Sequence, residues 1–517
     1  MKPSGSILFL SFVLLIFLGA AGSAFAQTSG SAATPAAVLP ASGRNNQGGS
    51  VGATQQAVSG TTTSVNTLNP SVQVSGPYGG SVRSATALPF SGKLSLADAL
   101  QRGLAYNLGG IGVAHTARQT AAQVTVARSA LLPNLNANLS ETIEQNDLAA
   151  LGLRISVPGF HIPSIAGPFN YFALQASLSQ TVANFTTFNN YRAAQATARA
   201  SQYSLQDARD LITLAVGGAY LQVLAAQARV NAAQAQLDTA NAVLHQATEQ
   251  HSQGVLAQLN VDQNQVHSLT QQQQITTLHN DLAKQKINLA RLTGLPPNAA
   301  YQLTDTFAFS PAPARNVDEA VAQAEQQRAD LKAAQAQVEA AAKALSAARA
   351  ERLPSASLSG DYEVIGTNPS QSHGAFTVVG TVSIPLWQGG RAAGDIAQAE
   401  AVLAQRKSEL EDTRGQVEAE VRQVYLDLEA SASQVELARK NLQVAQETLG
   451  MTRERMQAGI INTVEVVQAQ QTVSGAQLDL IDSVFAHNLS KVSLARALGH
   501  AAEQIPDLLK PQQTPQP

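Results

Sequence analysis

Apolar residues recur at alternating spacings of three and four from Val417 to Met456. This is the seam of a coiled coil, and it is narrower than the apolar stripe of an ordinary surface helix. No proline interrupts residues 391–498, so we predict a first helix of roughly 65 residues, about 100 Å long. Gly459 suits a left-handed cap at its end, and a second helix returns from about Thr463 to Leu498. The pattern therefore predicts a long helical hairpin.

The same pattern occurs 205 residues earlier in the chain, where Gly254 corresponds to Gly459. The returning arms end in matching Lys, Leu-Ala-Arg and Gly residues at 286–294 and 491–499. Fixed positions of such different residue types favour duplication over coincidence. We therefore expect repeat 1 at residues 91–295 and repeat 2 at residues 296–500.

The upstream part of each repeat corresponds at a distance of 221 residues. Ser95 and Asn316 both resemble helix N-caps, each with an acid at the third helical position. From Ser95 to Leu132 the pattern predicts a pair of helices, broken near Gly109 and Gly110. A Leu-Pro dipeptide then ends the helical pattern in both repeats.

After each Leu-Pro the apolar period changes from 3.5 to 2, which predicts β-strands. The predicted strands lie at about 134–146, 169–182, 355–365 and 376–385. Strands of roughly ten residues suit a membrane span, and closed membrane barrels need about eight strands or more. Open sheet edges are not tolerated in lipid. If the strands enter a membrane, four of them require an oligomer, and three copies would supply twelve.

The two ends of the chain differ from this pattern. Residues 1–26 read as a signal peptide, with Lys2, an apolar run and an Ala-Phe-Ala cleavage site. Residues 27–90 are rich in Ser, Gly and Thr, and we expect a disordered linker there. We also expect a disordered tail at 501–517.

Composition excludes several classes of function. The net charge of −3 argues against a nucleic-acid partner. The chain has no cysteine, which excludes disulfides, thiolate metal sites and a lipid-modified N-terminal cysteine. No motif for catalysis is present, so we expect no enzyme activity and no cofactor. The histidine spacings, such as His245 with His251, put neither candidate pair on one helix face, so no metal site is predicted.

The repeated order of helix, Leu-Pro, two strands, long helix, glycine turn and returning helix resembles the TolC-like family of outer-membrane efflux and secretion channels. The segment from Ile384 to Arg391 is similar to the family's strand-to-helix junction, with Pro385, Trp387, Gly389 and Gly390. Residues 180–185 of the first repeat lack the proline and the glycine pair, so we expect a differently built bend there. Trp387 and Tyr171 are candidates for an aromatic girdle at the membrane interface, or for ordinary packing.

The resemblance implies a mixed α and β membrane protein. Each chain would supply four transmembrane strands and two long helical hairpins to a homotrimer. The trimer would form a 12-stranded β-barrel in outer-membrane lipid and a coiled-coil α-barrel in the periplasm. Such a channel works passively, in efflux or type I secretion. The expected partners are a periplasmic adaptor protein and an inner-membrane transporter of the RND or ABC type.

Both hairpin turns carry apolar residues, which are costly at an exposed tip unless a partner covers them. The resemblance implies that the adaptor docks here. The candidate docking residues are Gly254, Val255, Leu256, Gly459, Ile460 and Ile461. The alternative is that the glycines only cap helices and the aliphatic residues only staple the two arms together.

The family carries acidic residues just past the second turn, and rings of carboxylates select cations. Glu465 stands at the first matching position, and Gln468 replaces the second acid. Asn260 is the equivalent of Glu465 in the first repeat, with Asp262 nearby. Asn462 and Glu465 also match a capping box, and Asp262 also suits a helix N-terminus, so both interpretations stay open.

The main alternative is a secreted structural or adhesive coiled-coil protein without channel activity. Such a rod has no need of four period-2 strands of similar length. A porin without adaptor partners is a third possibility, but it would leave the apolar tips unexplained.

Overall fold

The computed structural model describes residues 49–57, 68–82, 89–148, 150, 152, 156–157, 160–161, 164–311, 316–458, 460–461, 463–499, 501 and 505. Residues 41–517 form one compact unit. The expected signal peptide lies outside the described residues.

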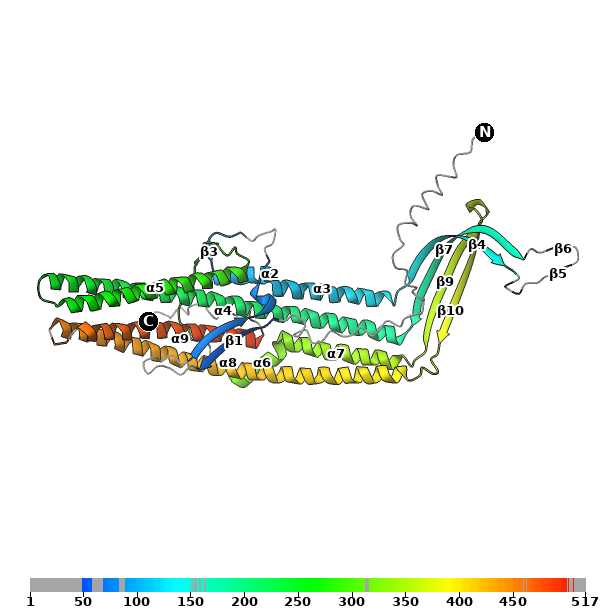
Figure 1. The fold of residues 1–517 in the computed structure, drawn as a ribbon. Helices are drawn as coiled ribbons and strands as arrows, with labels where there is room; N and C mark the ends of the chain where they lie inside the picture. Colours follow the sequence, from blue (N-terminus) through cyan, green and yellow to red (C-terminus); the bar gives the residue numbers. More distant parts are fainter. Residues whose placement is uncertain are drawn as a thin grey trace, which may run out of the picture. The chain divides into compact units, whose positions relative to one another are not determined.

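Two long helical hairpins dominate the fold (Figure 1). The first consists of α4 (Phe185–Ser252, 68 residues) and α5 (Gln258–Thr293, 36 residues). The second consists of α8 (Arg391–Gln457, 67 residues) and α9 (Thr463–Leu498, 36 residues). These bounds match the coiled-coil pattern within a few residues. Helices α4 and α9 contact each other, so the lateral order is α5, α4, α9, α8.

Shorter helices extend along the long ones towards the strands. They are α2 (Leu96–Tyr106), α3 (Leu108–Ser129), α6 (Val317–Gln327) and α7 (Ala329–Ala350). Helix α3 contacts α4, whereas α7 lies between α4 and α8. The small-residue face of α7 is well suited to two close neighbours, because alanine lets backbones approach.

Capping side chains determine the first residue of these short helices. Ser95 and Asp98 form the predicted capping box, and Asn316 caps α6 by accepting a hydrogen bond from the Asp318 amide. The break between α2 and α3 falls at Asn107, two residues before the predicted glycines. Asn107 Oδ1 accepts from the amides of Gly109 and Gly110, so the glycines belong to the first turn of α3.

A four-stranded antiparallel sheet stands at the end of the helices away from the hairpin turns (Figure 1). Its strands are β4 (Asn134–Asp147), β7 (Ile165–Ala183), β9 (Ser355–Gly366) and β10 (His373–Ser383), in the order β10-β9-β7-β4. The four predicted strands are confirmed. The fourth begins and ends earlier than predicted, which leaves Ile384 and Pro385 in the junction. Proline lacks the N–H that a ladder needs.

Two very short two-stranded pairs lie outside this sheet. One is the parallel pair of β3 (Lys93–Leu94) and β8 (Gln302–Leu303). The other is the antiparallel pair of β5 (Ser156–Val157) and β6 (Phe160–His161), inside the β4–β7 connection. A short 3-10 turn, η2 (Pro369–Gln371), connects β9 to β10.

The expectation of a disordered linker at 27–90 is wrong for part of that range. Strands β1 (Val51–Ala57) and β2 (Leu68–Val74) pair antiparallel, and η1 (Gly76–Gly79) follows. The pair contacts α4 and α9, with Val51 and Tyr78 buried. Polar composition suggested disorder, but a few alternating aliphatic residues bury themselves on a surface that the helices already provide.

The tail is corrected in the same way at two positions. Ala501 and Ile505 are both fully buried and belong to the main core with Leu489 and Val492. Helix α4 also contains a stretch long and apolar enough to cross a membrane, but most of that stretch is buried against its neighbours. The packing of α4 therefore accounts for its hydrophobicity.

Candidate functional site: the apolar sheet face and the hairpin tips

The apolar positions of the four strands fall on one face of the sheet. Leu139 pairs with Leu174, and Leu174 pairs with Val364 on the next strand. Tyr362 pairs with Phe376 in the last pair. Because paired residues point to the same side, the apolar rows join across all four strands. Leu135, Leu139, Ile143 and Phe376 are each more than 70% exposed, so none of the residues that the structure describes covers this part of the face.

The other face of the sheet is mainly polar. Asn136 pairs with Ser177, Ser177 with Asp361, and Asp361 with Thr377. Gln175 Nε2 donates to Asp361 Oδ1 at 3.3 Å across this face. A sheet with one apolar and one polar face can stand between an apolar and an aqueous environment. The strands of a membrane barrel have this arrangement, with lipid on one side and a water-filled lumen on the other.

Both edges of the sheet are unpaired among the described strands. Strand β4 pairs only with β7, and β10 only with β9. Each edge presents N–H and C=O groups to any further strand. A sheet of this kind is complete only when it pairs with other copies or closes on itself.

The two junctions between sheet and long helix are built differently, as predicted. At the second junction Gly389 and Gly390 have φ of +59° and +89°, a region where side chains other than hydrogen are strained. Gln388 Nε2 also donates to the Glu351 carbonyl. At the first junction Asn184 caps α4 by accepting from the Thr187 amide at 3.1 Å.

The two candidate girdle aromatics lie in different settings. Trp387 is 88% exposed beside the equally bare Leu386, at the junction end of the sheet. Tyr171 pairs with Thr142, which puts it on the face opposite the apolar rows, where it stacks with Phe169. Tyr171 therefore does not fit a girdle on the apolar side, and Trp387 stays a candidate.

The first hairpin turn is a Schellman-type cap. Gly254 has φ of +74°, its amide donates to the His251 carbonyl, and the Val255 amide donates to the Gln250 carbonyl at 2.9 Å. Val255 is 73% exposed, whereas Leu256 is half-buried. The cap and the exposed aliphatic residue therefore coexist at this tip.

The second turn repeats one of these bonds. The Ile460 amide donates to the Arg455 carbonyl at 3.0 Å, which is the counterpart of the Val255 bond. Ile460 is 67% exposed and Ile461 is half-buried. Gly459 and Asn462 lie outside the described residues, so the predicted glycine cap and the Asn462–Glu465 capping box stay predictions.

The candidate gate residues all lie in the first turns of the returning helices. Glu465 and Gln468 are exposed on α9. Asp262 is exposed on α5 and accepts a hydrogen bond from Gln258 Nε2, and Asn260 is half-buried. The structure brings them to the same end as the docking residues (Figure 1).

A buried cluster of charges, which the sequence analysis missed, joins the two hairpins midway along the helices. Arg496 Nη2 on α9 donates to Asp207 Oδ1 on α4 and lies 3.7 Å from Asp330. Arg328, at the start of α7, pairs with Asp330 and Glu420. Burial alone would lower the pKa of Arg496, but the carboxylates of Asp207 and Asp330 raise it above its usual value. Arg496 therefore keeps its positive charge despite its burial.

A connecting segment, residues 307–310, crosses the outside of α9 and is also held by polar contacts. His487 Nε2 and Lys491 Nζ both donate to the Ser310 carbonyl at 3.2 Å, and Asn488 donates to the Ala308 carbonyl. Burial, reinforced by the Lys491 charge, lowers the pKa of His487 to about 4. Burial also lowers the pKa of Lys491 to about 8.

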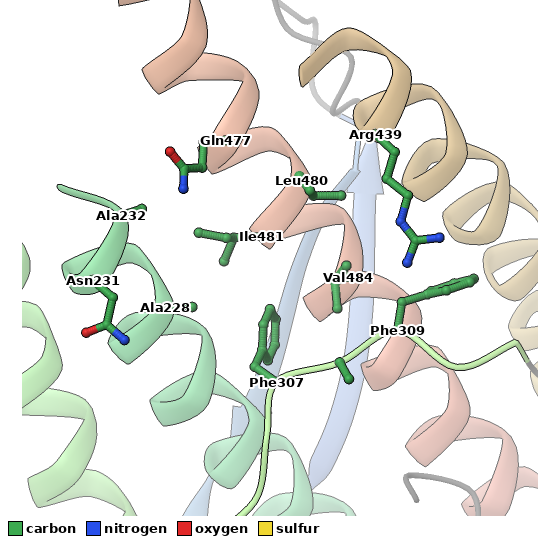
Figure 2. Close-up of a pocket in the computed structure, with 11 residues that line it drawn as sticks. Ala228, Asn231, Ala232, Phe307, Phe309, Arg439, Gln477, Leu480, Ile481 and Val484 are labelled. Carbon is green, nitrogen blue, oxygen red and sulfur yellow. The ribbon is translucent and has the colours of Figure 1, made fainter. Parts of the chain in front are cut away.

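An open hollow of about 650 Å³ lies beside this segment, between α4, α9 and α8 (Figure 2). Phe307 and Phe309 form one wall, and the Arg439 guanidinium lies 4.7 Å from the Phe309 ring. Within the described part of the chain, no three His, Asp or Glu side chains gather as a metal-binding group. Nothing in this hollow points to catalysis.

Comparison with known proteins adds sequence and structural relatives. The model of the outer membrane efflux protein family matches residues 113–295 and 320–500. The chain is 28% identical over 397 residues to the pyoverdine export outer membrane protein OpmQ of Pseudomonas aeruginosa, covering 74% of this chain and 80% of OpmQ. It is 23% identical over 390 residues to the outer membrane protein TolC of Vibrio cholerae, covering 74% of this chain and 85% of TolC.

Solved structures share the fold. The outer membrane protein VceC of Vibrio cholerae superposes with a TM-score of 0.67 at 19% identity, covering 79% of this chain and 97% of VceC. The MtrE outer membrane channel of Neisseria gonorrhoeae gives a TM-score of 0.65 at 16% identity, covering 82% of this chain and 96% of MtrE.

Proposed function

The chain belongs to the outer membrane efflux protein family, and we propose that three copies of it form one continuous export duct. The protein lies in the outer membrane, with its helices in the periplasm. In the proposed assembly, three internally duplicated chains contribute twelve β-strands to one barrel and twelve long helices to one tunnel. The duct conducts passively and carries out no chemistry of its own.

The observation that carries this proposal is the two-faced sheet with two unpaired edges. An exposed apolar face of this extent needs lipid or a partner to cover it. Unpaired edges cannot remain in lipid, because each unsatisfied backbone group costs several kcal/mol there. Pairing β4 of one copy with β10 of the next satisfies both requirements and leaves the polar face around a lumen.

The long helices support the periplasmic part of the proposal. At about 1.5 Å per residue, 67 residues of α8 extend roughly 100 Å from the sheet. A duct of that length reaches far from the outer membrane. It therefore needs contact only at its tips to receive cargo from an inner-membrane transporter of the RND or ABC type.

The tips are the proposed docking site for a periplasmic adaptor. Val255 is an exposed aliphatic residue on a capped turn, Ile460 is exposed at the second turn, and Leu256 and Ile461 stand beside them. Gly254 and Gly459 complete the proposed set. Rigid turns lower the entropy cost of docking.

The proposed gate lies next to the docking site. Glu465 would form a ring of three carboxylates in a trimer, and such rings prefer cations. Gln468, Asn260 and Asp262 would line the same constriction. With a single acid per chain at the matched pair of positions, the preference for cations should be modest.

Fractionation combined with conductance tests the proposal. The full chain should sediment with outer membranes, require detergent for extraction and run as a trimer. In a planar lipid bilayer the trimer should give discrete conductance steps. A protein that is released without detergent and gives no conductance would instead be the secreted coiled-coil rod.

A further inference from the structure

A polar patch on α9 is buried beneath the connecting segment 307–310. His487, Asn488 and Lys491 are each at most 4% exposed, although all three side chains are polar. His487 Nε2 and Lys491 Nζ both donate to the Ser310 carbonyl at 3.2 Å. A carbonyl oxygen only accepts, so the neutral imidazole carries its proton on Nε2. Residues 307–310, together with His487 and Lys491, are named the clasp.

The buried lysine of the clasp has no acidic partner. Lys491 is 1% exposed and forms no ion pair with any residue that the structure describes. Burial lowers the pKa of Lys491 to about 8, so most of its molecules are still charged at neutral pH. One positive charge therefore already lies beneath the segment, where the Ser310 carbonyl oxygen receives it.

Protonation of His487 places a second positive charge beside the first. The Nδ1 side of the ring faces Ser431 Oγ on α8 at 3.4 Å, and a hydroxyl carries no balancing charge. Burial, reinforced by the Lys491 charge, lowers the pKa of His487 to about 4, and hydrogen bonds to the backbone of Ser310 and Leu428 oppose this only in part. The closed clasp therefore excludes a proton that an exposed histidine takes up near pH 6.5.

The neighbouring charged groups on α8, α9 and α4 do not supply a counter-charge. Asp427 of α8 is half-buried, and burial raises its pKa, so acid neutralises this carboxylate early. Arg439 of α8 adds a further cation, 4.7 Å from the Phe309 ring. Asp482 of α9 is already paired with Arg229 of α4.

Two further carboxyl groups lie on the connecting segment and on α9. Asp305, which precedes the clasp, accepts hydrogen bonds from Tyr220 and from the Leu96 amide. Asp479 lies two helical turns before His487. Among the described residues no carboxylate forms an ion pair with either cation of the clasp, so acid leaves the two positive charges unbalanced.

The fold of the returning helix does not require this patch. In the first repeat, Leu282 and Ala283 stand 205 residues before His487 and Asn488. Leu282 is 6% exposed, so an aliphatic side chain fills the position of the histidine there. Helix packing alone therefore does not account for a histidine at residue 487.

The segment 307–310 is held more weakly than the helix beneath it. It belongs to no helix or strand, Ala308 is exposed, and Phe307 and Phe309 are only half-buried. Helix α9, in contrast, is buried at nearly every position from 483 to 498. Segments with few buried contacts open at a lower free energy than packed helices do. Strain beneath the segment is therefore relieved by the segment first.

We propose that the clasp is a pH-sensitive switch: acid protonates His487, and the segment 307–310 then lifts from α9 while the helices stay folded. Lifting lets water reach both cations, which removes the cost of burying them together. It also widens the hollow, because Phe307 and Phe309 form one of its walls (Figure 2). Water-filled porins let protons cross the outer membrane, so the acidity of the medium reaches the clasp. The switch lies within one chain and does not depend on the proposed trimer.

Engineered thiols report the opening, because the natural chain has no cysteine. Ser310→Cys places a thiol in the clasp with little change of shape, at a position that is 5% exposed. Ala308→Cys places a thiol on the exposed side of the same segment. Dithiodipyridine, which reacts with thiols even in acid, is applied to the full chain in detergent at pH 7 and pH 4.5. The ratio of the rates at 310 and 308 cancels the effect of pH on the reagent.

This ratio should rise in acid by up to roughly 50-fold, because opening returns the pKa of His487 from about 4 to 6.5. His487→Gln keeps an Nε2 donor for the Ser310 carbonyl but takes up no proton. In that variant the ratio should change by less than about threefold. Lys491→Gln removes the neighbouring charge, so the rise in acid should be smaller than in the chain with the natural lysine.

A third thiol distinguishes local opening from unfolding. Ala445→Cys lies in a separate core cluster with Val473, where Ala445 is 5% exposed, and it should react slowly at both pH values. An equal rise at 310 and 445 means that the whole chain unfolds, which overturns the switch. An unchanged ratio with the natural His487, or an equal rise in His487→Gln, also overturns it. Conductance and trimer formation test the proposed function separately from all of these results.

Discussion

Arg496 on α9 and Asp207 on α4 lie 289 residues apart in sequence, and their side chains form a hydrogen-bonded ion pair of 2.6 Å. Arg496 is almost completely buried, and Asp330 of α7 approaches it from a third helix. This pair ties the two hairpins together at the point where three helices meet.

Replacing Arg496 by leucine should destabilise the chain by about 3–5 kcal/mol, because it leaves Asp207 and Asp330 near the core without that cation. Denaturant unfolding of the detergent-purified protein measures the change. Arg349→Leu is the matched control, since Arg349 pairs with Glu400 on the surface and should cost at most about 1 kcal/mol. Equal effects of the two changes would contradict the structural role of Arg496.

His487 should make stability depend on pH between 6.5 and about 4. Its pKa is lowered from 6.5 to about 4 in the folded chain, so over this range the unfolded chain binds a proton that the folded chain excludes. Stability is therefore fully present above pH 6.5 and falls as the pH falls through the window, by up to roughly 3 kcal/mol. Comparing the unfolding temperatures of the natural chain and His487→Gln at pH 7 and pH 4.5 isolates this contribution from that of the carboxylates. Parallel curves for the two proteins would show that His487 does not contribute.

Gly218 should tolerate no side chain, because an added Cβ would lie 2.4 Å from Val72 Cγ2 of β2. Gly218→Ala should loosen the β1–β2 pair from α4 and cost about 1–3 kcal/mol. Limited proteolysis near residues 49–82 should then be faster. Gly450→Ala is the control: its Cβ meets nothing within 4 Å, so it should stabilise α8 by up to about 1 kcal/mol. Unchanged proteolysis of Gly218→Ala would argue that the pair is not docked.

Placing acids at both tips, with Val255→Asp and Ile460→Asp, should abolish export in cells without disturbing the trimer or its conductance in bilayers. A charged group on an apolar docking surface must be desolvated without a partner. Export of a reporter substrate and cross-linking to the adaptor measure the effect. Val82→Asp, an exposed aliphatic residue away from the tips, serves as control and should export normally. Normal export by the tip variant would show that Val255 and Ile460 do not bind the adaptor and only hold the two arms of each hairpin together.

Glu465→Gln should weaken the preference of the channel for cations, and Gln468→Glu should strengthen it, because each changes the ring by three charges in a trimer. Reversal potentials in a salt gradient report this preference. Glu447→Gln, at an exposed position on α8, is the control with the same chemical change. If Glu465→Gln and the control behave alike, Glu465 acts only at the helix N-terminus.

The periodicity of the sequence was enough to predict the long helices and the large strands. The 3.5-residue period marked α8 and α9 to within about one residue, and the period of two marked all four large strands. These signals are local, because a helix or strand exposes the same side chains to its surroundings at every repeat. The positions of the hairpin turns could also be predicted, because a glycine followed by aliphatic residues between two helices is a local pattern.

Features that depend on distant neighbours could be found only in the folded chain. Arg291 and Arg496 stand in matching motifs, yet one is exposed and the other lies within a cluster of carboxylates. The β1–β2 pair lies in a segment whose composition predicted disorder, and it is ordered because α4 and α9 supply the surface that it covers. The pairing of β7 with β9, which joins the two halves of the sheet, likewise leaves no trace in either strand alone. Burial and strand pairing depend on the two elements that meet, whereas the sequence pattern of one element describes only its own surface.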